Sequence, residues 1–294
     1  MARIIDNAQL AQAPPPGPLR YGLFRAATLT EDLGEREIAA GFQIPAVDCG
    51  VSRLYDALCD PAEATEKTFD EGLPFMEAVP YWVYSTRQCG IVGRTEAELS
   101  GSVRSRLLGG EQTQVEAALW GGTAPAVDPS LTGTAGVTTV VPAVAGAGAA
   151  IAALEESFYS EYGYVGTIHV NTSAYAAARY AGLVTLADSA VPSPGTLVTP
   201  LGSRWSFGAG YGITGPAGIA PAAGNAWAFM TPPVWIRRSG IIAQDDLRSA
   251  LDRTFNQYMG LAERVYGHTW TCPVVHAVEI PLAAPAVVDI TPAA

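Results

Sequence analysis

The chain has 294 residues, of which 49% are hydrophobic, and this is ample for a packed core and excludes disorder throughout. Its formal net charge of −11 at pH 7 argues against a surface that grips nucleic acid, because phosphate neutralisation requires clustered Lys and Arg. The longest apolar stretch, residues 142–154, is short and made mostly of Ala and Gly, so it does not predict a membrane span.

The first residues carry charge and lack the continuous apolar stretch of a secretory signal, so we expect synthesis and folding in the cytoplasm. Four cysteines are widely spaced, and none belongs to a CxxC pair: they are Cys49, Cys59, Cys89 and Cys272. In a cytosolic setting this spacing favours reduced thiols over a disulfide framework. Redox chemistry is therefore not expected.

An extended arm is predicted over residues 1–45, where the run APPPGP at 13–18 favours a polyproline conformation without internal hydrogen bonds. Such a segment gains order only by lying on something else. The charged stretch from Leu54 to Ser85 follows, flanked by apolar patches on both sides. This pattern is typical of a long two-stranded loop that projects from the body.

A long helix is predicted over residues 95–120. Thr95 and Glu98 match a capping box at its start, and apolar residues then recur at helical spacing. The stripe ends at Trp120, just before a glycine pair that suits a helix end. We expect the helix to be weakened at Gly109-Gly110.

A second helix is predicted from about Gly148 to Tyr162, followed by a strand at 166–171. Thr172 or Ser173 can cap the short helix that comes next. Beyond Gly182 the sequence indicates strands and turns, with two more strand-like runs between residues 252 and 282. The fold class predicted from this order is α+β, with two interleaved units and extensions.

Metal binding was considered for His268, Cys272 and His276, which stand at i, i+4 and i+8. Pro273 opposes a helix here, and on a strand four residues separate neighbouring ligands by about 13 Å, too far to share one ion. A structural role is expected for all three, and His169 is expected to be packed or hydrogen-bonded. Phosphate-loop and GxSxG motifs are absent from the sequence.

The order of elements resembles that of the major capsid proteins of tailed bacteriophages. The resemblance rests on the arm, the charged loop before a helix ending in GGEQTQVEAALWGG, the passage TIHVNTSAYAAA and the closing segment LAERVYGHTW. It covers most of the chain, from about residue 35 to residue 282. The implied parts, in chain order, are an N-terminal arm (1–45), an extended loop with flanking strands (46–94), the spine helix of a peripheral domain (95–122), an axial domain (123–225), and a return to the peripheral domain with a C-terminal tail (226–294).

The resemblance implies a structural protein without cofactors or membrane contact, assembled in the host cytoplasm and located in the virion. It implies self-assembly into hexamers and pentamers of an icosahedral shell that encloses double-stranded DNA without sequence-specific binding. A portal and a decoration protein are implied partners, and a separate scaffolding protein is expected because no coiled-coil propeptide precedes the arm. Encapsulins share the fold, so a nanocompartment shell is the alternative. A cytosolic enzyme with a Gly/Pro-rich loop is a third interpretation, which lacks a convergent catalytic set.

Three residues resemble the isopeptide-forming set of some capsids in this family. Lys67, the only lysine of the chain, lies in the predicted loop, while Asn256 and Glu263 stand seven residues apart. The implied reaction joins Lys67 to Asn256 of a neighbouring subunit, with Glu263 as the carboxylate that assists. It requires a desolvated, neutral amine and a carboxylate ready to take a proton.

Regular strand alternation would put residues 256 and 263 on opposite faces, and a bulge at Gly260 is expected to restore a common face. The alternative interpretation involves no chemistry. In it Lys67 is a solvated loop residue, Asn256 satisfies backbone groups, and Glu263 pairs with an arginine such as Arg237 or Arg264.

Overall fold

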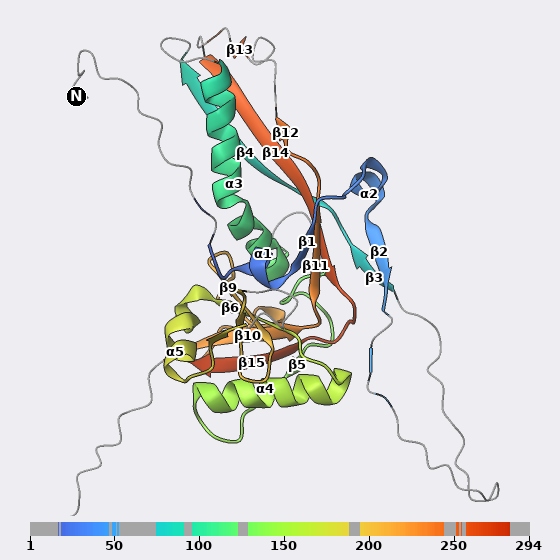
Figure 1. Ribbon diagram of the computed structural model, residues 1–294, viewed down its shortest axis with the longest axis vertical. Coiled ribbons are helices and arrows are strands. Elements are labelled where there is room, and N and C mark those ends of the chain that lie inside the picture. Colours follow the sequence, from blue (N-terminus) through green and yellow to red (C-terminus); the bar gives the residue numbers. More distant parts are fainter. Residues whose placement is uncertain are drawn as a thin grey trace, which may run out of the picture.

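The computed structural model describes a little over two thirds of the chain, with side chains in nearly all of that part (Figure 1). The described residues are Gly17, 19–46, 49–50, 52, 75–90, 96–122, 129–187, 195–243, 251–252, 254 and 257–282. Two long helices stand out among shorter ones. The helices are α1 (Leu23–Ala26), α2 (Glu35–Ala40), α3 (Glu96–Gly121), α4 (Ala147–Tyr162) and α5 (Tyr175–Tyr180), with 3-10 turns at Thr172–Ala174 and Pro216–Gly218.

The first sheet is organised around one long strand, β14, in the described part of the chain. Strand β4 lies antiparallel along one edge of β14, and β11, β12 and β13 pair with its other edge, with β1 parallel to β11. Its strands are β1 (Thr28–Thr30), β4 (Tyr81–Gly90), β11 (Val234–Arg238), β12 (Ile242–Ala243), β13 (Leu251–Asp252) and β14 (Gln257–Trp270).

Helix α3 covers one face of this sheet along β4 and β14 (Figure 1). Gly260 lies on the covered face, where an added Cβ would come within 3.1 Å of the Leu99 side chain and 3.2 Å of Val103. A glycine at this position therefore permits the close approach of helix and strand. The helix itself continues across Gly109 and Gly110 without interruption, so the expected weak point is not seen as a break.

The second sheet has the order β5-β15-β10-β6-β9-β8-β7 in the described part of the chain. Helix α4 lies across one of its faces, with α5 beside it (Figure 1). Its strands are β5 (Thr138–Thr139), β6 (Thr167–Asn171), β7 (Thr185–Leu186), β8 (Leu197–Val198), β9 (Arg204–Gly208), β10 (Asn225–Thr231) and β15 (His276–Pro281).

The domain boundary expected at residue 225 does not coincide with the edge of this sheet. Strand β10 lies between β6 and β15 near its middle, and β15 also belongs to it, although both come from the segment 226–294. Strand β10 continues this sheet after β9, and the chain then forms β11 to β14 of the first sheet before it returns to the second sheet with β15. The boundary drawn from the sequence cuts through a hydrogen-bonded sheet.

A two-stranded antiparallel ribbon is formed by β2 (Phe42–Pro45) and β3 (Phe75–Ala78), with Phe42 opposite Ala78. The ribbon is the base of the predicted two-stranded loop. Residues 53–74, which carry most of the predicted loop and Lys67, lie outside the described residues.

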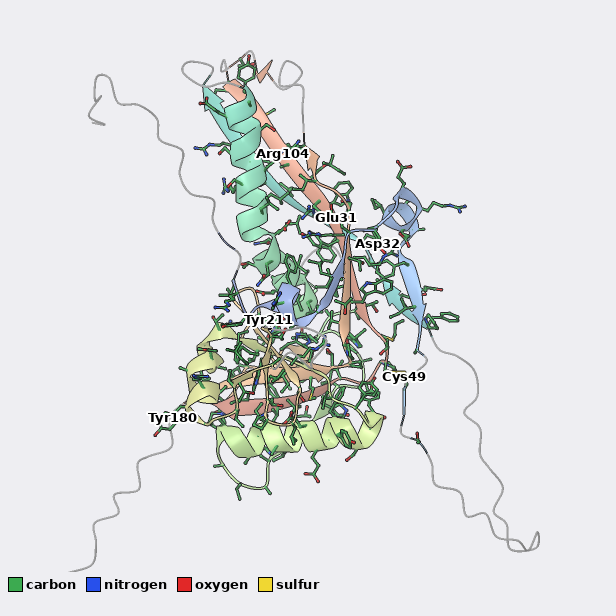
Figure 2. The ribbon with its side chains drawn as sticks, in the orientation of Figure 1. Glu31, Asp32, Cys49, Arg104, Tyr180 and Tyr211 are labelled. Carbon is green, nitrogen blue, oxygen red and sulfur yellow. A yellow bond between two sulfur atoms is a disulfide. The ribbon has the colours of Figure 1, made fainter. Side chains whose placement is uncertain are left out.

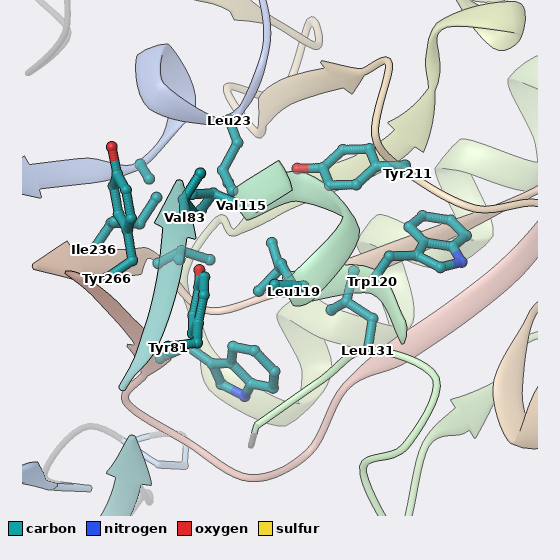
Figure 3. Packing of buried hydrophobic residues seen from close by; sticks show 14 of the residues in the cluster. Leu23, Tyr81, Val83, Val115, Leu119, Trp120, Leu131, Tyr211, Ile236 and Tyr266 are labelled. Atoms are coloured by element: carbon teal, nitrogen blue, oxygen red, sulfur yellow. The ribbon is translucent and has the colours of Figure 1, made fainter. Parts of the chain in front are cut away.

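A continuous core joins the two sheets through the C-terminal end of α3 (Figure 3). Trp120 contacts Phe229 of the second sheet edge-to-face, with ring centroids 4.9 Å apart, and Tyr211 at 5.3 Å. Val115 and Leu119 on the same helix belong to the same buried cluster as Tyr81 of the first sheet. The helix that spans the first sheet thus ends inside the core of the second.

A buried carboxylate, that of Glu116, fixes this junction. It accepts hydrogen bonds from the backbone N–H of Leu23 at 3.1 Å, from that of Gly210 at 3.0 Å, and from the Gln112 side chain at 2.8 Å. Burial raises the pKa of Glu116, and these hydrogen bonds oppose the rise. Gly210 can only be glycine here, because an added Cβ would lie 1.9 Å from the Thr113 carbonyl oxygen.

Two local expectations are corrected by the structure. Asn171 caps the 3-10 turn Thr172–Ala174 that leads into α5, because its side chain accepts from the Ser173 N–H at 3.0 Å. Thr172 and Ser173 are therefore not the cap. Cys49 and Cys272 form a disulfide with a Cα–Cα distance of 5.5 Å, so the expectation of reduced thiols is wrong for this pair. The two cysteines are 223 residues apart in sequence, and the spacing therefore carried no signal of it. Cys59 and the Cys89 side chain lie outside the described residues.

Candidate functional site

One face of the first sheet carries large apolar side chains that the described chain leaves uncovered. Side chains alternate along β4 and β14, so the positions that do not face α3 point to the opposite side. Trp82 and Tyr84 of β4 are 50% and 66% exposed there, and Met259 of β14 is 49% exposed. Ile242 of β12 lies directly opposite Glu263 and is also exposed. We call these five residues, Trp82, Tyr84, Ile242, Met259 and Glu263, the outer face.

Contiguous aromatic and aliphatic side chains on a sheet face usually mark a contact with another molecule, because water solvates them poorly. Glu263 lies within this surface, with Tyr84 opposite it on β4 and Ile242 opposite it on β12. Its half-buried carboxylate is therefore flanked on both sides by apolar neighbours. A segment that covered the outer face would also desolvate Glu263.

The structure places only one of the three crosslink residues, since Lys67 and Asn256 lie outside the described residues. The bulge expected at Gly260 is wrong: β14 pairs with β4 in unbroken register from Gln257 opposite Gly90 to Tyr266 opposite Tyr81. The extra residue lies instead on the partner side, between β11 and β12. There Ser239 donates its N–H to the Val265 carbonyl oxygen at 2.9 Å, and its Oγ accepts from the Val265 N–H at 3.1 Å.

Arg237 and Arg264, the expected partners of Glu263 in the alternative interpretation, bind other carboxylates. Arg237 donates to Asp32 at 2.9 Å and to Glu37, and Arg264 donates to Glu111 at 3.1 Å. The proposed ion pairs with Glu263 are therefore not formed.

These ion pairs attach the segment after β1 to the first sheet (Figure 2). The guanidinium of Arg237, by hydrogen bonding, lowers the pKa of Asp32 and of Glu37. Arg238 adds a contact to Glu31 at 3.1 Å. Nothing in the local sequence pattern marked this network, because its partners lie about 200 residues apart.

The three residues of the histidine stripe have separate partners. His268 is hydrogen-bonded to the Tyr81 hydroxyl and to the Pro129 carbonyl oxygen, both at 2.9 Å, while His276 contacts Ser157 at 2.9 Å. Cys272 is in the disulfide. The predicted structural role of the stripe is confirmed, and no group of three or more His, Cys, Asp or Glu in the described part of the chain could hold a metal ion.

His169 is fully buried between the hydroxyls of Tyr211 at 3.0 Å and Thr231 at 2.9 Å. Burial lowers the pKa of His169 to about 3, so it is neutral at physiological pH. Ser206 extends the same network through the Tyr211 hydroxyl at 2.6 Å. The prediction that His169 is packed or hydrogen-bonded is confirmed.

None of the helices among the described residues is long and apolar enough to cross a membrane.

Comparison with known proteins separates sequence from fold. No protein-family model matches the sequence, and no curated protein matches it. Solved structures nevertheless align along almost the whole chain. The capsid of the empty GTA particle aligns with a TM-score of 0.55 at 10% identity, over 95% of this chain and 96% of that chain. A chain of Mycobacterium phage Cain aligns at 0.53 with 12% identity, over 96% and 97% of the two chains. One of Mycobacterium phage Adephagia aligns at 0.51 with 14% identity, over 93% of each.

At such low identity, likeness of structure establishes the fold alone. The match runs through both sheets and α3 rather than through one common substructure, since it covers 95% of the chain. The chain therefore has the α+β fold of the GTA capsid subunit and of these phage chains, as the resemblance in sequence order implied.

Proposed function

We propose that this chain is a major capsid protein, which assembles with copies of itself into hexamers and pentamers of an icosahedral shell around phage DNA. The observation that carries the proposal is the match to a capsid subunit over 95% of the chain. The mature protein is then part of the virion, after assembly in the host cytoplasm. A scaffolding protein, a portal and a decoration protein are the further partners in this proposal.

The outer face supports the proposal on physical grounds. Trp82 and Tyr84 each expose at least half of their surface to solvent. Burial of aromatic side chains contributes most to the binding energy of an interface where neighbouring groups exclude water. In a shell each copy repeats the same contacts under symmetry, so modest interfaces accumulate over many copies. The acidic net charge suits a wall that contains DNA without binding its phosphates.

In this proposal α3 and the first sheet form the peripheral domain, and the second sheet with α4 and α5 forms the axial domain near the centre of a capsomer. The ribbon of β2 and β3 is the base of the extended loop. Because β10 and β15 belong to the second sheet, the axial part takes strands from residues 225–231 and 276–281 as well as from 123–225.

The direct test is to express the chain with its scaffolding protein and to examine the product by negative-stain electron microscopy. From this expression we expect closed polyhedral particles of uniform size. In purified virions we expect this chain to be the most abundant protein, together with DNA. A monodisperse monomer under all conditions would contradict the proposal. Particles filled with an enzyme and free of nucleic acid would favour a nanocompartment instead.

We also propose the isopeptide crosslink between Lys67 of one subunit and Asn256 of its neighbour. The Lys67 amine attacks the side-chain carbonyl carbon of Asn256, a new amide bond forms, and ammonia leaves. Glu263 accepts the amine proton and returns it to the leaving nitrogen. Because β14 has no bulge at Gly260, the expected alignment of residues 256 and 263 does not support the proposal. The position of Glu263 among apolar side chains on the outer face does support it, because a covering loop would desolvate both the carboxylate and the amine.

Boiling the particles in SDS before electrophoresis tests this reaction. We expect a ladder of covalent oligomers in the wild type, none in Lys67→Arg or Asn256→Asp, and a strongly slowed reaction in Glu263→Gln. Glu77→Gln, which removes an exposed carboxylate hydrogen-bonded to Gln43 in the ribbon, is the matched control. Monomer bands alone in mature wild-type particles would contradict the crosslink and leave the shell function intact.

A further inference from the structure

A cavity in the described part of the chain lies between α4 and the turn that joins β8 to β9. Its volume is about 410 Å³, and Met230 of β10 is among the residues that line it. The rim carries Tyr159, Val165 and Leu201, which are 58%, 40% and 70% exposed. This cavity belongs to the second sheet and is separate from the outer face. A pocket with an apolar rim of this kind can bury a large part of an inserted side chain.

The pocket is lined mostly by apolar groups, but one buried carboxylate and one buried hydroxyl belong to its wall. Glu155 is buried and accepts from the Thr199 hydroxyl at 2.6 Å, whereas Glu156, which also lines the pocket, is exposed. Ser203 is fully buried, and its Oγ has no hydrogen-bond partner among the described residues. The ion pairs found in the described part of the chain include neither Glu155 nor Glu156. Buried polar groups are normally paired, so Glu155 and Ser203, with the exposed Glu156 next to them, indicate a ligand that donates hydrogen bonds and carries positive charge.

We propose that this pocket receives an arginine side chain from a second copy of this chain, so that adjacent subunits of a capsomer are joined through it. The inference rests on the proposed function, because it needs copies arranged side by side. An arginine fits the observations better than a compact cation. Its aliphatic stem matches the apolar rim, and its planar guanidinium offers five N–H donors, enough to serve two carboxylates and the Ser203 hydroxyl together.

The composition of the chain favours the same choice. Of its 17 basic residues all but Lys67 are arginines, so a basic side chain offered by a second copy is almost always an arginine. In a ring of identical subunits the contact is heterologous: the pocket on one flank of a subunit meets a different patch on the next. Each pocket is then filled by the same arginine of its neighbour, and buried arginines of this kind commonly dominate the binding energy of an interface.

Photocrosslinking in assembled shells tests this inference. In Tyr159→p-benzoylphenylalanine shells, irradiation is expected to give a dimer of the chain, and mass spectrometry to place the crosslink beside an arginine of the second copy. The double variant Glu155→Gln, Glu156→Gln should lower the crosslink yield at least several-fold, and replacement of the identified arginine by Gln should lower it equally. Glu161→Gln, which removes an exposed carboxylate of α4 that does not line the pocket, is the matched control and should leave the yield unchanged.

Each outcome decides between two statements. Intact shells with no dimer, with a crosslink to another protein, or with a yield unaffected by the double variant would overturn the arginine contact alone. Failure of the wild-type chain to form shells in any condition would overturn the proposed function, and the contact with it.

Discussion

In the second sheet, β6, β9 and β10 are buried on both faces, with α4 on one side and the end of α3 with Tyr211 on the other. In the first sheet, β4 and the N-terminal half of β14 are covered by α3 on one face, while the outer face is exposed. A single chain therefore completes the packing of one sheet and leaves the other half-covered. In the shell that we propose, the second sheet supplies a stable body and the outer face of the first sheet supplies apolar surface for neighbouring subunits.

The largest effect is expected where the packing is complete. Phe158 of α4 is fully buried and lies 4.8 Å from the Tyr162 ring and 5.5 Å from His276, so Phe158→Ala should lower the free energy of unfolding by about 4 kcal/mol. Tyr159→Ala, at the next and exposed position, should change it by less than about 0.5 kcal/mol. Urea titration of the unassembled subunit measures both. Equal losses would show that the second sheet is not the stable body.

The disulfide ties the segment after β2 to the turn between β14 and β15, and its loss should cost somewhat less. Cys49→Ser should lower the free energy of unfolding by about 3 kcal/mol, because a long loop of the unfolded chain is no longer closed. The wild type in reductant should match the variant, and the variant should not respond to reductant. A wild-type chain equally stable with and without reductant would show that this bond contributes nothing to the body.

Acid should weaken the interior through three buried histidines, because burial lowers the pKa of His276 as well as those of His169 and His268. Burial lowers the pKa of His169 to about 3 and that of His268 to about 4, from 6.5 when unfolded. Below pH 6.5 these histidines are therefore protonated in the unfolded chain while they remain neutral in the folded chain. Stability present above pH 6.5 is lost towards pH 4, by up to about 1.4 kcal/mol per pH unit for each histidine.

Glu116 acts in the opposite sense, since its raised pKa means that the folded chain binds its proton first as the pH falls. We expect the three histidines together to outweigh it. Urea midpoints measured between pH 7 and pH 4 should fall, and His268→Gln should flatten the decline by roughly a third to a half, because one of the buried histidines no longer titrates. A midpoint that rises with acidification would show that Glu116 controls the interior.

The smallest effect on the isolated subunit is expected at the outer face. Tyr84→Thr replaces an exposed aromatic residue on β4 by a β-branched residue that also favours strands, and should change the free energy of unfolding by less than about 0.5 kcal/mol. The yield of closed particles should nevertheless fall at least tenfold, as judged by electron microscopy and sedimentation. Normal assembly of this variant would remove the outer face from the set of subunit contacts.

Elements with a local signal were predicted well from the sequence. The apolar stripe around Val103 and Leu107 indicated the long helix, while its expected cap, Thr95, lies outside the described residues. Gly163 marked the end of α4, where it adopts a left-handed conformation. The predicted loop is supported at its base by the pairing of β2 with β3. The roles of His169 and His268 followed from their strand-like surroundings.

The errors share a different origin. The Cys49–Cys272 bond, the entry of β10 and β15 into the second sheet, and the shift of the bulge from Gly260 to Ser239 all depend on residues that are distant in sequence. The ion pairs of Arg237 and the acidic pocket behind Tyr159 have the same character. No periodicity within one segment reports which other segment it will meet.

The amino-acid order by itself determined the α+β class, the long helix and the likeness to capsid subunits in the order of elements. Those properties follow from spacing and turn chemistry, which act over a few residues. Only the tertiary structure decided which faces are covered, which carboxylates are paired and which pocket stays open. Burial is a property of surfaces that meet in space, and two segments meet only after the whole chain has closed around its cores.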